Sequence, residues 1–84
     1  MHEVNIILSA RKDLDGLDKK VFTQIKNKII SLASNPRPFG SLKLTAEEEG
    51  YRIRSGNYRI PYRIDDKNKM IYVYRVKHRK ESYR

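Results

Sequence analysis

The last 34 residues of the chain, 51–84, carry most of its charge and all of its tyrosines. They hold eleven Lys and Arg against three Asp and Glu, which is +8 of a formal net charge of +9, and all six Tyr residues. Phosphates of a single-stranded nucleic acid attract cations, and its bases stack on flat rings. Residues 51–84, which we call the basic half of the protein, therefore predict a nucleic-acid contact. The alternative is a solvated basic face with the tyrosines in the core.

Several arginines of this half fall on one face of a predicted hairpin. Gly56-Asn57 between two β-rich runs predicts a two-residue turn, and the resulting register places Arg54 opposite Arg59. Like charges directly opposite each other destabilise a sheet by up to about 1 kcal/mol per pair. Guanidinium groups gathered in this way suit a phosphate backbone, so we expect one sheet face to bind negative charge through Arg52, Arg54, Arg59 and Arg63.

The C-terminal segment adds further candidates for chemistry. If residues 77–84 turn helically, Arg79 and Tyr83 project from the same side. Histidine is the side-chain type that ordinarily titrates near neutral pH, so His78 is the candidate for proton transfer, the alternative being a packing role. The chain has no nucleophile elbow, phosphate-binding glycine loop or zinc-protease motif.

Length and composition predict one small domain spanning residues 1–84. There are no cysteines, and the only two histidines, His2 and His78, lie far apart in sequence, so we expect no disulfides, no metal and no cofactor. The opening apolar run is too short for a signal peptide, and no run reaches the roughly 18 apolar residues of a membrane span. These features predict a cytoplasmic protein with no membrane contact.

The first fifty residues carry a net charge of only +1 and predict the scaffold. A strand is expected over residues 3–8, followed by a helix from about Ala10 with Ser9 as its N-cap. A second helix is expected after Asp18, which would cap it, and should end near Ala33 before the prolines. Its apolar stripe, at helical spacing, must pack on the sheet: Val21, Phe22, Ile25, Ile29 and Leu32.

The remaining elements follow from local signals. Residues 39–50 predict a loop, with Leu42 and Leu44 inserted into the core. Residues 65–68 predict a turn, and residues 70–76 a strand that is buried on both faces and lies inside the sheet. Pro61 has no N–H to donate toward that strand, so we expect a gap in the ladder there.

The order of these elements, with Gly-x-Tyr-Arg-x-x-Tyr at residues 56–62 and His-Arg-x-x-x-Tyr at residues 78–83, resembles the RelE/ParE toxin superfamily, and within it the RelE-type mRNA interferases. The resemblance implies an α+β fold, in which two helices pack on a curved, mostly antiparallel, four-stranded sheet. It implies metal-independent cleavage of mRNA in the ribosomal A site, by attack of a 2′-hydroxyl on the adjacent phosphate. The implied partners are the mRNA, the 16S rRNA of the A site and a RelB-type antitoxin, in a toxin–antitoxin hetero-oligomer.

The resemblance also implies roles for individual residues. Arg52 and Arg54 match a basic pair, Arg59 matches a residue that stabilises the phosphate, Arg79 one near the leaving 5′-oxygen, and Tyr83 a ring that orients a nucleotide. Further RNA contacts are expected from Lys43, Arg63, Lys77 and Lys80.

Some members of the superfamily have lysines at the positions of Arg52 and Arg54. Arginine stays protonated and cannot act as a general base. Either catalysis is electrostatic, or His78 takes the proton. Two other functions remain open: a ParE-like toxin that inhibits DNA gyrase, and a non-catalytic module that binds RNA or the ribosome.

Overall fold

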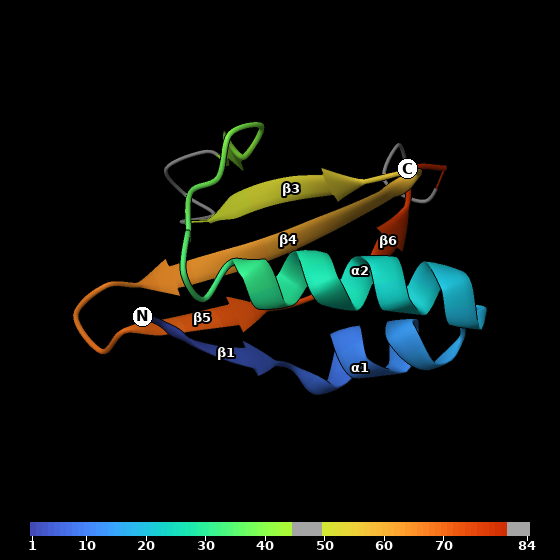
Figure 1. Cartoon of the computed structure of the whole chain (residues 1–84), viewed down its shortest axis with the longest axis horizontal. Coiled ribbons are helices and arrows are strands. Elements are labelled where there is room, and N and C mark those ends of the chain that lie inside the picture. Colours follow the sequence, from blue (N-terminus) through green and yellow to red (C-terminus); the bar gives the residue numbers. More distant parts are fainter. Residues whose placement is uncertain (45–49, 81–84) are drawn as a thin grey trace.

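The computed structural model describes residues 1–44 and 50–80. Tyr83 and residues 45–49 lie outside the described part. The elements follow the chain in the order drawn in Figure 1: β1 (Glu3–Ile6), α1 (Leu8–Asp15), α2 (Lys19–Ser31), β2 (Leu42–Lys43), β3 (Tyr51–Ser55), β4 (Tyr58–Asp65), β5 (Met70–Val73) and β6 (Lys77–His78). No described helix is long and apolar enough to cross a membrane.

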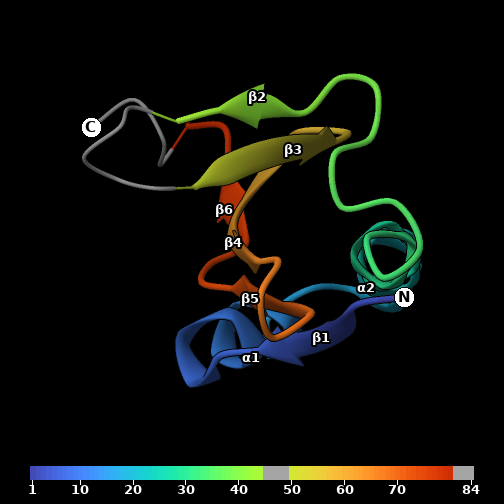
Figure 2. The same ribbon diagram turned by 90° about the vertical axis from the view of Figure 1, so that its left-hand side faces the viewer.

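The two helices pack against a mostly antiparallel sheet, as predicted. The strand order is β1-β5-β4-β3-β2, and β6 pairs with β4 outside this path. Among the described strands, the outer pair β1 and β5 is parallel and the other pairs are antiparallel. Figure 2 shows the curvature of the sheet from β1 to β2. The four predicted strands are present, and the two further strands, β2 and β6, have two residues each.

The two helices differ at their N-termini, since α2 has a side-chain cap and α1 does not. The prediction for α2 is confirmed, because Asp18 is its N-cap and its side chain accepts a hydrogen bond of 2.9 Å from the N–H of Val21. The prediction for α1 is wrong: the helix begins at Leu8 after Ile7, without a side-chain cap, and Ser9 lies inside it. The helix therefore starts directly where β1 ends, and Leu8, expected in the strand, is exposed.

Both helices and the sheet contribute to one buried core. Its members come from α1, α2, β3, β4 and β5 and the segments beside them: Ala10, Leu14, Ile25, Ile29, Leu32, Ile53, Ile60, Tyr62, Ile71, Val73 and Val76. Leu42 was predicted to join this core and does not, because β2 is the edge strand and leaves the side chain 54% exposed. Leu44 is half-buried.

The predicted gap at Pro61 is confirmed. The ladder between β4 and β5 covers residues 62–65 of β4, and the ladder between β4 and β6 covers residues 58 and 59. Pro61 lies between the two ladders and offers only its carbonyl, which accepts a 3.1 Å hydrogen bond from the N–H of Tyr74. The strand β5 lies inside the sheet as predicted but ends at Val73. Only alternate residues of β5 are buried, so the prediction of burial on both faces is wrong.

A carboxylate of α1 holds the segment that crosses from β5 to β6. Arg75 donates from Nε to Asp13 Oδ2 over 2.8 Å and from Nη2 to Oδ1 over 3.2 Å, and the N–H of Val76 donates to Oδ2 over 2.9 Å. Burial raises the pKa of Asp13, but these hydrogen bonds and the charges of Arg75 and Lys77 outweigh it and hold the pKa below its ordinary value. The contact fixes where β6 begins.

Asp13→Asn is expected to destabilise the protein at neutral pH by about 1–3 kcal/mol, because the three N–H donors of Arg75 and Val76 then face a weaker acceptor. A lowered carboxyl pKa stabilises the fold above its unfolded value of roughly 4, and this stabilisation is lost as the pH falls through the folded pKa. The difference between variant and wild type should therefore shrink below about pH 4. Urea unfolding from pH 3 to 7 measures it, and Asp15→Asn, on the exposed side of α1, is the control. Equal effects of the two substitutions would contradict the role of Asp13.

Candidate functional site

The hairpin of β3 and β4 brings two arginines side by side. The predicted register is confirmed: Ser55 pairs with Tyr58, and Arg54 with Arg59. The turn between them uses Gly56, whose φ of 59° is readily adopted by glycine. Since directly opposite residues of an antiparallel pair share a face, the two guanidinium groups leave the sheet on the same side.

A third arginine reaches this place from the C-terminal segment. Arg79 follows β6, and its N–H donates a 2.7 Å hydrogen bond to the carbonyl of Asn57 in the hairpin turn. A hollow of about 160 Å³ lies between these groups and is lined by Arg54, Gly56, Asn57, Arg59 and Arg79. Three predicted site residues are thus brought together, and Gly56 and Asn57, which the sequence indicated only as a turn, form part of the wall.

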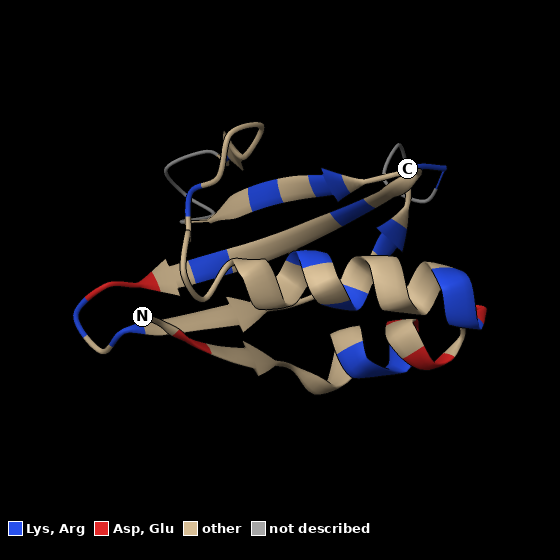
Figure 3. Ribbon diagram, viewed as in Figure 1, with Lys and Arg blue, Asp and Glu red and all other residues tan. Residues whose placement is uncertain are grey.

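The charge around this hollow is strongly positive. Lys77 pairs with Arg59 across β4 and β6 and therefore shares its face. Figure 3 shows Lys and Arg on β3, β4 and β6. Among residues 1–44 and 50–80, neither Arg54 nor Arg79 forms an ion pair. Lys80, which follows Arg79, is exposed. We call the hollow with its three arginines, Arg54, Arg59 and Arg79, the arginine hollow.

Arg52 lies next to the arginine hollow rather than in it. A neighbouring hollow of about 230 Å³ is lined by Gly40, Leu42, Arg52, Ile53 and Arg54. Because Arg54 lines both hollows, the two are adjacent along β3. The predicted pair Arg52 and Arg54 therefore extends the positive surface toward the edge strand β2.

Lys43 and Arg63 lie in a different place, at the other end of β3 and β4. They line an open hollow of about 580 Å³ together with Tyr51, Lys67 and other residues of this end. In the described part of the chain, neither Lys43 nor Arg63 has an ion-pair partner. The predicted RNA contacts are therefore spread over the length of the sheet, from the hairpin turn to the turn after β4.

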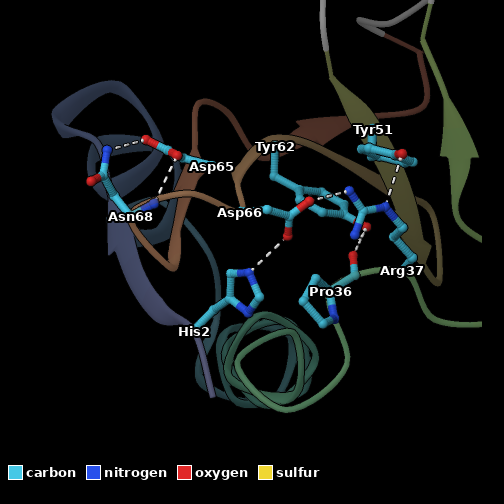
Figure 4. Close-up of polar contacts among 8 residues, drawn as sticks. All are labelled: His2, Pro36, Arg37, Tyr51, Tyr62, Asp65, Asp66 and Asn68. Carbon is cyan, nitrogen blue, oxygen red and sulfur yellow. Dashed lines mark hydrogen bonds and ion pairs between the residues drawn. The ribbon is translucent and has the colours of Figure 1, made fainter.

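A polar cluster that the sequence did not predict holds this second end together (Figure 4). Arg37, in the loop after α2, donates from Nη2 to Asp66 over 2.8 Å and from Nε to the hydroxyl of Tyr51 over 3.0 Å. His2 Nε2 lies 3.1 Å from the same carboxylate of Asp66. The hydrogen bonds from Arg37 and His2 lower the pKa of Asp66, which is held between the N-terminus, the loop and the turn after β4. No local signal in the sequence links these residues.

Tyr62 is buried beneath this cluster and contacts it. Its ring stacks near that of Tyr51, with centroids 6.0 Å apart, and its hydroxyl donates a 2.7 Å hydrogen bond to the carbonyl of Pro36. Burial raises the pKa of Tyr62 to about 12. Tyr51 has the guanidinium of Arg37 over its ring at 5.2 Å, so these two tyrosines serve the structure of this end.

His78 lies apart from the arginines. It pairs with Tyr58, and its ring meets the ring of Tyr58 edge-on with centroids 5.2 Å apart. It lines a hollow with Asp13, Gly16, Leu17 and Val76, near the end of α1. Since successive residues of a strand point to opposite faces, Lys77 shares the face of Arg59 and His78 does not. Tyr83 lies outside the described residues, so its predicted place beside Arg79 stays a prediction.

Comparison with known proteins shows the family to which the chain belongs. A family model described as the ParE toxin of type II toxin–antitoxin system, parDE, matches residues 4–83. Toxin RelG of Mycobacterium tuberculosis is 32% identical, over 99% of this chain and 97% of that protein. The RelBE2 toxin–antitoxin complex of the same organism has a TM-score of 0.81 at 28% identity, covering 92% of this chain and 96% of that one.

A structure from an archaeon is equally similar. The RelE–RelB complex of Pyrococcus horikoshii has a TM-score of 0.82 at 29% identity, covering 93% of this chain and 94% of that one. The similarity extends over nearly the whole chain, since the family model matches residues 4–83 and the two structures cover 92% and 93% of the chain. The chain therefore belongs to the RelE/ParE family of type II toxin–antitoxin toxins.

Proposed function

We propose that the protein is a ribosome-dependent endoribonuclease that cleaves mRNA in the A site and so inhibits translation. The observation that carries the proposal is the arginine hollow, where three permanently charged side chains meet around a space with room for a phosphate. The reaction forms a bond between a 2′-oxygen and the adjacent phosphorus and breaks the bond from phosphorus to the 5′-oxygen. Its products carry a 2′,3′-cyclic phosphate and a 5′-hydroxyl.

The arginines stabilise the charge that this reaction creates. Attack of the 2′-oxygen adds negative charge to the phosphoryl oxygens, where Arg54 and Arg59 donate hydrogen bonds, and Arg79 stabilises the leaving 5′-oxygen. A single donor placed at such developing charge contributes about 2.7–4 kcal/mol. None of the three arginines accepts the proton of the 2′-hydroxyl. The proton therefore leaves through the substrate, solvent or ribosomal groups.

The size of the hollow supports a substrate that is presented by the ribosome. Pockets that enclose a small molecule usually have at least about 300 Å³, and the arginine hollow has about 160 Å³. It can surround a phosphate but not a nucleotide. The ribosome supplies the rest of the substrate site by holding the mRNA, and the cations Lys43, Arg52, Arg63, Lys77 and Lys80 contact RNA around it. Such a protein acts in the cytoplasm.

We propose a RelB-type antitoxin as the protein partner, in a toxin–antitoxin hetero-oligomer. The similar structures from Mycobacterium tuberculosis and Pyrococcus horikoshii are both complexes of this kind. The protein has a net charge of +9, so an acidic segment of the antitoxin would be electrostatically complementary to the basic face and would cover it. Binding there would keep the arginine hollow away from RNA.

The description of the matching family model as a ParE toxin favours a second candidate, inhibition of DNA gyrase. Two assays separate the candidates. Primer extension on translated and free mRNA detects cleavage in the A site, and a supercoiling assay detects inhibition of gyrase. Cleavage restricted to translated mRNA supports the proposal. Inhibited supercoiling with intact mRNA supports the ParE-like reading, and ribosome binding with neither effect would indicate a non-catalytic module.

Arg59→Ala is expected to lower the single-turnover rate of cleavage on programmed ribosomes by on the order of 10²–10³, because it removes a donor to the transition state. Ribosome binding should fall far less. Arg63→Ala, on the same strand and face, is the matched control and should show the reverse split. Equal losses of rate and binding in Arg59→Ala would rule out a role confined to the transition state.

Ribosome binding is expected to weaken steeply with salt, because the basic half of the protein releases counterions from RNA. A plot of log affinity against log salt concentration measures this dependence for the antitoxin-free protein. Arg63→Ala should reduce the slope by roughly one, since it removes one phosphate contact. A flat plot for the wild type would mean that the exposed cations do not bind phosphates.

A further inference from the structure

We propose that His78 is a positioning residue, which fixes Arg79 in the arginine hollow through the backbone and transfers no proton. Its expected effect on cleavage rests on the proposed function, whereas its effect on the backbone does not. The evidence lies in four contacts around the short strand β6.

Both backbone N–H groups that flank the Cα of Arg79 are held. The N–H of Arg79 donates to the carbonyl of Asn57 over 2.7 Å, and the N–H of Lys80 donates to Nδ1 of His78 over 3.2 Å. The first contact ties Arg79 to the hairpin turn, and the second restrains the rotation between Arg79 and Lys80. Together they orient an exposed side chain that follows a strand of only two residues.

The contact between His78 and Lys80 has the geometry of an Asx turn. In such a turn, a side-chain acceptor at one residue binds the N–H two residues later. A backbone N–H can only donate, so in this contact Nδ1 of His78 is the acceptor. The imidazole is thus used as an acceptor toward the backbone of its own turn.

The ring of His78 is itself held in place. It pairs across β4 and β6 with Tyr58, and the two rings meet at 89°. On this face it lies beside Asp13, Leu17 and Val76, whereas Arg79 lines the arginine hollow. The histidine therefore supports the hollow from the opposite face of the sheet and does not line the space in which a phosphate would bind.

Two substitutions separate an acceptor from a proton carrier. His78→Asn places Oδ1 near the position of Nδ1, keeps the Asx turn and cannot act as a base at neutral pH. His78→Phe keeps a ring beside Tyr58 and removes the acceptor, and His78→Leu is a second variant without it. Hydrogen exchange of the Ile60 and Val73 amides, in the core strands, reports whether each variant remains folded.

The first measurement is hydrogen exchange of the Lys80 amide by NMR in the free protein. Protection is expected in the wild type and in His78→Asn, and its loss in His78→Phe and His78→Leu. The second is single-turnover cleavage on programmed ribosomes, where the two variants without an acceptor should be slower by on the order of 10² and His78→Asn should recover most of the rate.

Three results would overturn the proposal: an unprotected Lys80 amide in the wild type, a wild-type cleavage rate in His78→Phe, or a His78→Asn variant that protects Lys80 and is as slow as His78→Phe. The last result would assign the proton transfer to the imidazole. If the wild type cuts no mRNA on ribosomes, the proposed function fails, and the exchange of Lys80 still decides whether His78 holds the turn.

Discussion

The arrangement of the basic surface depends on one missing hydrogen-bond donor, the N–H of Pro61. Because Pro61 cannot donate to the neighbouring strand, the ladder of β5 ends after Tyr62 pairs with Val73. After three residues outside the ladder, the chain continues along β4 as β6, toward the hairpin turn, with its register shifted by one residue. A continuous strand in the register of β5 would pair Lys77 with Tyr58 and place Lys77 on the inner face of the sheet. The extra residue in the interruption instead pairs Lys77 with Arg59, so that Lys77 and Arg79 lie on the outer face with Arg59. The contacts of Asp13 with Arg75 and Val76 hold the interruption in place.

The same two strands build the core with one face and gather positive charge with the other. On the inner face, Ile53 pairs with Ile60, and both are buried. Burial of each such side chain contributes about 1.5–3 kcal/mol. On the outer face, the pairing of Arg54 with Arg59 costs up to about 1 kcal/mol. The inner pair outweighs the outer pair, so the register that the core requires also keeps two like charges side by side.

Signals from residues that are close in sequence are enough to predict part of this structure. The Gly56-Asn57 turn determines the hairpin register, Asp18 the start of α2, and Pro61 the gap in the ladder. The hairpin register, the start of α2 and the gap in the ladder are all determined by local interactions. Each depends on residues that are close in sequence or on a pairing partner that the turn defines. The arginines of the hairpin could therefore be placed on a common face without a structure.

Contacts between distant residues could not be predicted in the same way. The partners of Arg37 and Asp13 lie 29 and 62 residues away, and nothing nearby marks them. The face on which His78 lies depends on the register in which β6 pairs with β4. If the segment between β5 and β6 were one residue longer or shorter, His78 would lie on the outer face, and Lys77 and Arg79 would lie on the inner face. The exposed Leu42 has a related cause, because an apolar residue in a loop does not reveal that it will lie on an edge strand.

Because the hollow is lined by arginines, the proposed activity depends on groups outside the protein for proton transfer and for substrate geometry. Arginines stabilise the negative charge that develops on a phosphate, but they neither remove a proton nor release one. With about 160 Å³, the hollow also does not hold a nucleotide in a reactive shape by itself. In-line geometry of the 2′-oxygen and phosphate must then come from whatever holds the RNA, and correct geometry alone is worth several orders of magnitude in rate. Under the proposed function, the toxin supplies the charge and the ribosome supplies the geometry, so RNA in the ribosome would be cut and most RNA outside it would be spared.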